Sequence, residues 1–149
     1  MDVNLRNPWW SPDQVLGLMN QATWIKLNED ELAALVPGEP GTEQRAARLL
    51  EQGGMEVLII TRGAAGARAQ GSEGWVLEPD PVQAAKVVDT VGAGDAFSSV
   101  VICGLMRGWP WSLILKRAQS FAAAVVGLQG ATTGDRSFYE AIFENWEHS

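Results

Sequence analysis

The strongest constraint on the fold is a short, almost uninterrupted apolar run at residues 55–61. It reads Met-Glu-Val-Leu-Ile-Ile-Thr and is followed by Arg62 and Gly63. A run of this length and composition is typical of a parallel strand that is buried on both faces, with a loop at its carboxyl end. The run therefore predicts a central strand of an α/β protein.

Helical patterns alternate with strand patterns ahead of this run. Residues 42–52 place alanines and leucines on one helical face, with Thr42 as a possible N-cap and Gly53-Gly54 as the stop. Strands that alternate with helices form βαβ units, so we expect a parallel sheet with helices on both faces. The other elements expected in this half are a helix over 11–21, a strand over 24–27 and a helix over 29–35.

The second half of the chain changes in character. Short β-like runs are separated by Gly and Pro, and the last third is helical. The proline-rich piece at 78–81 is too short to be more than a loop, so we expect one domain over residues 1–149. The β-like runs are 64–70, 74–77 and 86–89, and the expected helices are about 94–107, 111–129 and 137–146.

Composition excludes several function classes. The chain has 149 residues and is 46% apolar, which is typical of a folded domain rather than a disordered tail. Its 11 Lys+Arg and 18 Asp+Glu give a net charge of −7, which argues against nucleic acid or an anionic membrane as a partner. A phosphate ligand is still allowed, because it needs only a local group of backbone N–H donors.

The cysteine, histidine and tryptophan residues limit the possible sites further. The one cysteine, Cys103, lies in an apolar run and is expected to be an inert core thiol. The one histidine, His148, is too isolated to predict a metal site. The seven tryptophans are expected to fill the core and edges of the sheet. Neither a signal peptide nor a membrane span is evident, so a cytoplasmic location is expected.

The segment with the most chemical content is residues 89–97, Asp-Thr-Val-Gly-Ala-Gly-Asp-Ala-Phe. Gly92, Ala93 and Gly94 can turn their N–H groups toward one point at the start of a helix, where an anion is favoured. Asp95 could then accept the proton of an incoming hydroxyl group during phosphoryl transfer. The alternative is that Asp95 only stabilises the helix N-terminus and the glycines only form a turn.

The same segment resembles the D-T-x-G-A-G-D-x-F signature of the ribokinase-like (PfkB) carbohydrate kinases. The resemblance implies an α/β fold with three αβα layers and a mostly parallel sheet. It also implies ATP-dependent phosphorylation of a sugar hydroxyl with Mg²⁺. In that reading Asp95 is the catalytic base, and Gly92, Ala93 and Gly94 form the anion hole with it.

Further motifs follow in the order of the family. Residues 61–66 resemble its T-x-G-x-x-G nucleotide loop, residues 2–6 its D-x-N-x-R strand, and residues 118–131 the late helix beside the adenine pocket. Arg6 could instead be a surface arginine, although we favour a ligand-facing role. The residues that the resemblance assigns to the nucleotide are Asn4, Arg6, Thr61, Arg62, Gly63, Ala64, Ala65, Gly66, Gln119 and Ala122, beside Gly92, Ala93 and Gly94.

Two pairs of residues are candidates for metal binding. Lys26–Glu31 resembles K-x-N-x-x-E, which implies that Asn28 and Glu31 arrange the hydrated Mg²⁺. The same two residues fit an N-cap with its capping-box partner, and both roles can hold together. Asp89 and Val91 lie where relatives bind a monovalent cation such as K⁺, and Asp89 could equally cap the loop.

The resemblance also has gaps. Val100 and Gln119 depart from the family's usual residues, and the family chain is about twice as long. We therefore expect a C-terminal fragment without the substrate and lid half, whose sheet edge pairs with a second copy or a partner half. The implied acceptor is a sugar or sugar acid, and a nucleoside is the less favoured choice. The competing hypothesis is a non-catalytic nucleotide-binding or assembly module.

Overall fold

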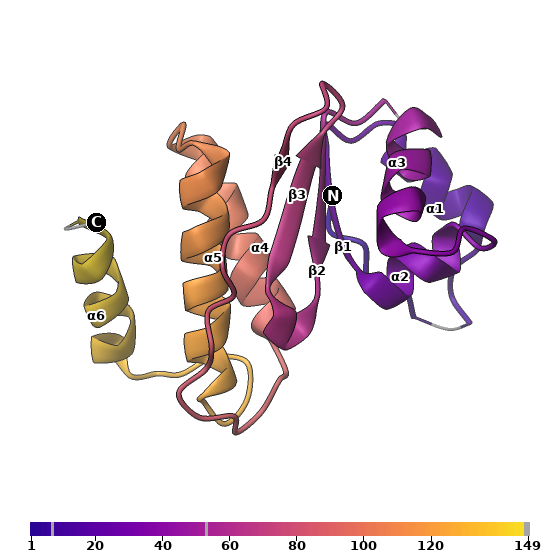
Figure 1. Cartoon of the computed structure of the whole chain (residues 1–149). Coiled ribbons are helices and arrows are strands. Elements are labelled where there is room, and N and C mark those ends of the chain that lie inside the picture. The colour runs from indigo at the N-terminus through magenta and orange to yellow at the C-terminus, as the bar shows by residue number, and fades with distance from the viewer. Residues whose placement is uncertain (7, 53, 148–149) are drawn as a thin grey trace. The chain divides into compact units, whose positions relative to one another are not determined.

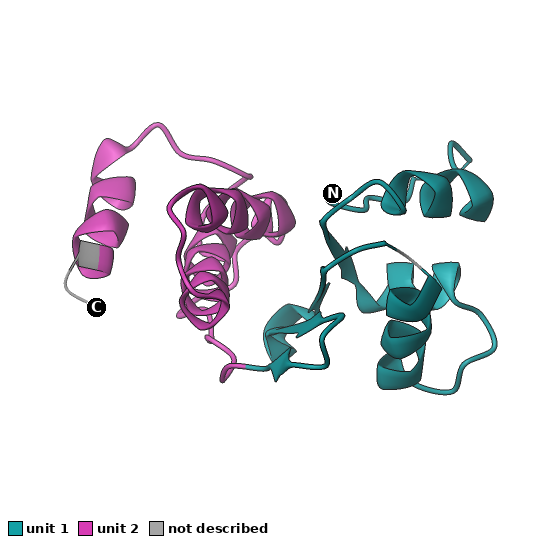
Figure 2. Cartoon of the chain, turned by 90° about the horizontal axis from the view of Figure 1, so that it is seen from above, with its two compact units in different colours: residues 1–78 teal, residues 79–149 magenta. Residues whose placement is uncertain are grey.

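The chain forms two compact units, residues 1–78 and residues 79–149 (Figure 2). The computed structural model describes residues 1–6, 8–52 and 54–147. The boundary falls at Glu78 and Pro79, inside the proline-rich piece that the sequence predicts to be a loop. Proline cannot continue a strand ladder, so this is a natural place for the sheet to end.

The first unit is built on a four-stranded sheet with the order β1-β2-β3-β4 (Figure 1). β1 and β2 are parallel, with Trp24 opposite Val57. β3 runs antiparallel to β2, and β4 runs antiparallel to β3. The strands are β1 (Trp24–Asn28), β2 (Val57–Thr61), β3 (Ala67–Gly71) and β4 (Val76–Leu77).

The expected α/β class is confirmed, but the sheet is mixed rather than mostly parallel. The reason lies in the short connection after β2. A single 3₁₀ turn, Gly63–Ala65, joins β2 to β3. A connection this short allows only an antiparallel return, because a parallel one needs a crossover of a dozen residues or more.

The first residues of the chain lie beside β1 as a further parallel segment. Asp2 pairs with Lys26, and the N–H of Val3 donates to the Lys26 carbonyl at 2.8 Å. The Lys26 ammonium, on a side chain that is buried, lies 3.0 Å from a carboxylate oxygen of Asp2. Burial lowers the pKa of the Met1 amino group, and the Asp2 carboxylate opposes that shift. Residues 1–3 are thus attached to β1 by backbone and side chains together.

Three helices pack with the sheet of the first unit. They are α1 (Pro12–Met19), α2 (Glu29–Leu35) and α3 (Thr42–Gln52), and the predicted helices agree with them closely. The Ser11 side chain accepts a hydrogen bond from the Gln14 N–H and caps α1, as the sequence predicts. The buried core of this unit includes Val15, Met19, Ile25, Leu27, Leu32, Leu49, Leu58 and Ile60.

The second unit is helical. Its helices are α4 (Ala93–Met106), α5 (Trp111–Val126) and α6 (Arg136–Glu147). Gly104 of α4 allows a close approach to α5, since a Cβ atom there would lie 2.6 Å from Ile114 Cγ1. None of the helices in the described ranges is both long and apolar enough to cross a membrane.

The expected β-like run at 86–89 is wrong. These residues are a loop, in which the N–H groups of Val88 and Asp89 donate to the Val126 carbonyl at 2.9 and 3.2 Å. The β-branched side chains favour an extended backbone, but the backbone donors of the run bond to the end of α5 instead of a strand. The loop is therefore fixed to the helix hairpin of its own unit.

Aromatic side chains hold α6 in the second unit. The Arg117 guanidinium lies 4.3 Å from the ring centroid of Trp109 and 5.4 Å from that of Trp146, and it donates to the Trp146 carbonyl. Phe121 adds an edge contact to Trp146 at 6.5 Å. Trp109 and Trp146 therefore pack among helices and not in the sheet. Trp9 does not fill a core either, because it is 85% exposed. Cys103 is half-buried rather than enclosed in the core.

Candidate functional site

The N-terminus of α4 is the part of the second unit with the clearest chemistry. Gly92 precedes the helix with φ of +82°, a conformation that glycine adopts without strain. The N–H of Ala96 makes the first helical bond, to the Gly92 carbonyl at 2.8 Å. The N–H groups of Gly94 and Asp95 have no acceptor among the described residues, as is usual in a first helical turn. This turn offers unused donors at the positive end of a helix.

Close packing explains why position 92 must be glycine. A Cβ atom there would lie 2.4 Å from Ala131 Cβ and 2.6 Å from Ala131 Cα. Those distances are shorter than any real carbon contact, and no flexible side-chain end is involved. The turn before α4 therefore rests directly against the segment that follows α5.

Asp95 is the third residue of α4, and its side chain is exposed. Its carboxylate makes no hydrogen bond or ion pair with a described residue. One turn further along, the Ser98 hydroxyl donates to the Gly94 carbonyl at 3.0 Å. A carboxylate that is accessible and beside unused N–H donors can accept a proton next to a bound anion.

Asp89 fastens two loops of the second unit. One carboxylate oxygen accepts the Val91 N–H at 3.0 Å, and the other accepts the Gly130 N–H at 3.2 Å. This confirms the loop-capping alternative for Asp89. Within the ranges that the structure describes, no three His, Cys, Asp or Glu side chains converge as a metal group would require.

Gln119 in α5 is a polar side chain that is buried in the second unit. It is 5% exposed, and neither its amide oxygen nor its amide nitrogen has a hydrogen-bond partner among the described residues. Such a group is costly unless something satisfies it. Ala122, three residues on, is half-buried on the same helix. The unsatisfied amide marks Gln119 as a candidate ligand contact.

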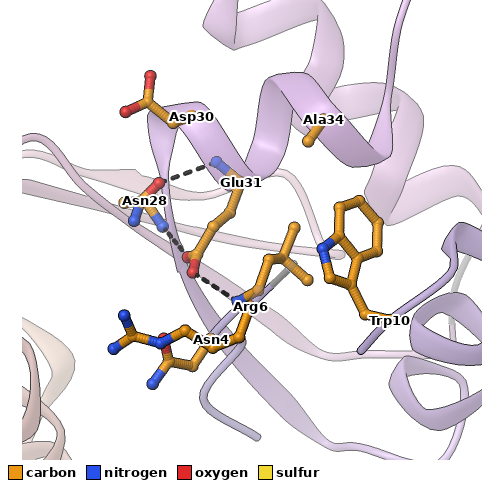
Figure 3. A pocket seen from close by; sticks show the side chains of 8 residues that line it. Asn4, Arg6, Trp10, Asn28, Asp30, Glu31 and Ala34 are labelled. Carbon is orange, nitrogen blue, oxygen red and sulfur yellow. Dashed lines mark hydrogen bonds between the residues drawn. The ribbon is translucent and has the colours of Figure 1, made fainter. Parts of the chain in front are cut away.

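The first unit has an open pocket of about 410 Å³ at the end of β1 (Figure 3). Asn4 and Arg6 extend on one side of it, opposite Trp10 and Ala34. Both Asn4 and Arg6 are exposed, and neither side chain has a hydrogen bond or ion pair within the described residues. The lining residues are Asn4, Leu5, Arg6, Trp10, Asn28, Asp30, Glu31 and Ala34.

Glu31 and Asn28 form the predicted capping box at this pocket. The Asn28 side-chain oxygen accepts the Glu31 N–H at 2.8 Å, and the Glu31 carboxylate accepts the Asn28 N–H at 2.9 Å. The second oxygen of Glu31 accepts the Leu5 N–H at 3.2 Å. Glu31 therefore fixes the start of α2 and the segment of residues 4–6 at once (Figure 3).

Residues 61–66 form a tight loop after β2. The Thr61 hydroxyl donates to the Leu27 carbonyl at 3.4 Å. Gly63 and Gly66 both have positive φ, +54° and +88°. The Arg62 side chain donates to the Ala65 carbonyl at 3.2 Å and to Glu78 at 2.6 Å. The loop thus has exposed small residues, Gly63, Ala64 and Ala65, on a backbone that Arg62 holds.

Comparison with known proteins decides the family. The model of the "pfkB family carbohydrate kinase" matches residues 1–137. The chain belongs to this family. Among curated relatives, it is 34% identical to a 1-phosphofructokinase of Haemophilus influenzae, over 86% of this chain and 42% of the relative. It is also 34% identical to a fructokinase of Klebsiella pneumoniae, over 89% of this chain and 46% of the relative.

Solved structures agree with the family fold. A nucleoside kinase of Burkholderia thailandensis in complex with inosine has a TM-score of 0.75 at 26% identity, over 93% of this chain and 45% of that one. A ribokinase of Arabidopsis thaliana with ribose and ATP has a TM-score of 0.75 at 24% identity, over 87% and 43%. The ribokinase-like fold is thereby confirmed. The chain spans less than half the length of the 1-phosphofructokinase and of the fructokinase.

The structure brings some candidate residues together within each unit. Asn4, Arg6, Asn28 and Glu31 share the pocket of the first unit, and Asn28 pairs with Thr61 across the sheet. In the second unit Asp89 and Gly92 both contact the segment at 130–131.

Sequence reasoning missed Glu78 as the partner of Arg62. No local pattern indicates this pair, because it depends on the hairpin register, which sets Ala69 opposite Leu77 and so places Glu78 at the level of Arg68.

Proposed function

We propose that this chain carries the nucleotide-binding and base-supplying part of an ATP-dependent kinase that phosphorylates a sugar or sugar acid in the cytoplasm. The observation that supports this most is the first turn of α4. There the unused N–H groups of Gly94 and Asp95 lie in the same turn as the exposed Asp95 carboxylate. Membership in a carbohydrate kinase family supports phosphoryl transfer as the reaction at this turn.

In the proposed reaction, Asp95 accepts the proton of the acceptor hydroxyl. The hydroxyl oxygen forms a bond to the γ-phosphorus, and the bond from that phosphorus to the bridging oxygen of ADP breaks. The N–H donors after Gly92 stabilise the charge on the equatorial oxygens. Gln119 and Ala122 of α5, and the loop of residues 61–66, are the proposed contacts to the rest of the nucleotide.

Asn28 and Glu31 of the first unit suit Mg²⁺ through its bound water molecules rather than by direct coordination. The Asn28 side-chain oxygen and both Glu31 oxygens already accept N–H groups, and each keeps a second lone pair. These lone pairs can accept hydrogen bonds from metal-bound water, which Mg²⁺ releases reluctantly. When bound, Mg²⁺ would neutralise the charge of the β- and γ-phosphates.

A monovalent cation such as K⁺ is the other proposed ion. Its proposed ligands are the Asp89 carboxylate and the Val91 carbonyl oxygen. The carboxylate keeps lone pairs beyond the two N–H bonds that it accepts. Such an ion would reinforce the junction of two loops that Asp89 already joins.

The relatives point to the acceptor class. Their names include a 1-phosphofructokinase, a fructokinase and a 2-dehydro-3-deoxygalactonokinase, of which the last, from Haloferax volcanii, is 28% identical over 138 residues. The exposed Asn4 and Arg6 suit hydroxyl or carboxylate groups of such an acceptor, or a phosphate. We also propose that an acceptor half, or a second copy, covers the outer side of residues 1–5.

The test is ATP turnover with fructose, fructose 1-phosphate and 2-dehydro-3-deoxygalactonate. We expect Asp95→Asn to reduce turnover by about 100-fold or more, because it removes the base. Asp80→Asn is the matched control, since Asp80 is also an exposed aspartate of the second unit. Calorimetric titration with a non-hydrolysable ATP analogue and Mg²⁺ separates binding from chemistry. Full turnover by Asp95→Asn, or a wild-type chain with neither turnover nor nucleotide binding, would contradict the proposal.

A further inference from the structure

The Arg62 side chain bonds back to the loop that follows β2 and does not extend into solvent. Its guanidinium donates to the Ala65 carbonyl at 3.2 Å, within the loop, and to Glu78 at 2.6 Å, just after β4. The backbone closes the same loop, because the Arg62 N–H donates to the Gly66 carbonyl at 2.8 Å. The Ala65 N–H returns to the Arg62 carbonyl at 3.0 Å. Side chain and backbone of one residue therefore define the loop at 62–66.

The contact to Glu78 is part of a longer series. The other Glu78 oxygen lies 3.7 Å from Arg68 Nη1, and the same nitrogen lies 2.8 Å from a carboxylate oxygen of Glu43 in α3. We call Arg62, Glu78, Arg68 and Glu43 the ion-pair network. It connects the loop after β2, the residue after β4, the start of β3 and the first turn of α3.

Burial indicates that the two arginines depend on this network. Their side chains are 21% and 17% exposed, whereas Glu78 is 42% and Glu43 is 72% exposed. A charge that is largely removed from water needs a partner, while an isolated surface pair contributes little. Glu78 is the only member that contacts both arginines, so it has the central position.

Apart from backbone hydrogen bonds, the loop has side chains no larger than a methyl group between Arg62 and Ala67. Its residues between Arg62 and Ala67 are glycines and alanines, and two of them have positive φ. Glycine-rich backbone samples many conformations when nothing restrains it. A loop that binds phosphate with backbone N–H groups must keep those groups aligned before the ligand arrives.

We propose that the ion-pair network positions the loop at 62–66 for its ligand, with the side chains of Arg62 and Glu78 as positioning groups, while ligand contacts in the loop come from its backbone. The inference rests on the proposed function for the identity of that ligand, a nucleotide. It makes Glu78 a determinant of nucleotide affinity although it lies outside every nucleotide motif. The effect of a substitution should decline along the network, from Glu78 to Glu43.

The test is amide hydrogen exchange of residues 63–66 in the 149-residue chain without any ligand. We expect Glu78→Gln and Arg62→Gln to speed this exchange about 5- to 10-fold, and Glu43→Gln to speed it less. Arg62→Lys keeps the charge but not the double donation, so it should fall between wild type and Arg62→Gln. Glu73→Gln is the control, because Glu73 is exposed on the same hairpin and has no ion pair within the described residues.

A second measurement distinguishes this inference from the proposed function. Calorimetry with an ATP analogue and Mg²⁺ should show a several-fold weaker Kd for Glu78→Gln and an unchanged Kd for Glu73→Gln. Unchanged exchange at 63–66 in Glu78→Gln overturns the inference, whatever the nucleotide does. Faster exchange in a chain that binds no nucleotide, even as wild type, supports the positioning of the loop and overturns the nucleotide as its ligand.

Discussion

In the pocket of the first unit, both oxygens of Glu31 accept backbone N–H groups, and Asn28 accepts one as well. At the start of α4 in the second unit, the Asp95 carboxylate and the N–H groups of Gly94 and Asp95 have no such partners among the described residues. Both regions carry acidic residues from family motifs. The difference teaches that Glu31 stabilises the local backbone structure, whereas the Asp95 carboxylate is accessible to a reactant.

The largest effect on stability is expected from Gly92→Ala, which disturbs the turn that precedes α4 and Asp95. The variant combines a positive φ with a Cβ atom 2.4 Å from Ala131. We expect the free energy of unfolding to fall by about 3 kcal/mol, from backbone strain and overpacking together. Urea denaturation measures it. Gly134→Ala is the control, since Gly134 has no atom within 4 Å of an added Cβ, and an equal loss there would contradict the packing argument.

A smaller effect is expected from Glu31→Ala in the first unit. This variant removes the acceptor of two N–H groups, those of Leu5 and Asn28. We expect a loss of about 2 kcal/mol in the free energy of unfolding, from a lost cap and an unsatisfied donor. Thermal denaturation and amide exchange at Leu5 would show it. Asp30→Ala, in the same turn, should cost less than about 0.5 kcal/mol. Equal effects of the two variants would mean that the Glu31 carboxylate does not support the structure more than a neighbouring exposed carboxylate does.

The smallest effect on stability is expected from Asp95→Asn. The side chain is exposed, so the variant loses only its interaction with the helix dipole, about 0.5 kcal/mol or less. The same denaturation experiment measures it. A loss as large as that of Glu31→Ala would mean that Asp95 stabilises the local backbone structure too, and the contrast between the two regions would fail.

Local signals in the sequence predicted local structure well. The capping box of Asn28 and Glu31 spans three residues, so its spacing alone is sufficient to find it. The N-cap at Ser11 and the bounds of α2 and α3 follow from equally short patterns. The glycine turn before α4 belongs to this class, because its residues are consecutive.

Features that depend on distant partners were not predictable in the same way. The apolar run at β2 shows that a strand is buried, but not that β3 returns antiparallel beside it. The valines before Asp89 predict a strand, since β-branched residues favour one. The sequence pattern does not show that the N–H groups of Val88 and Asp89 donate to the Val126 carbonyl instead. Arg62 and Glu78 are 16 residues apart, and only the hairpin register brings them together.

The position of Arg117 between two indole rings has a practical consequence. A guanidinium 5.4 Å from the Trp146 ring changes the surroundings of that chromophore, and Trp146 lies in α6, beyond residue 137, where the match to the family model ends. We therefore expect the fluorescence emission of Trp146 to change if α6 moves away from Arg117. Trp146 is thus an optical marker of α6, and comparison with Trp146→Phe isolates its signal from that of the other tryptophans.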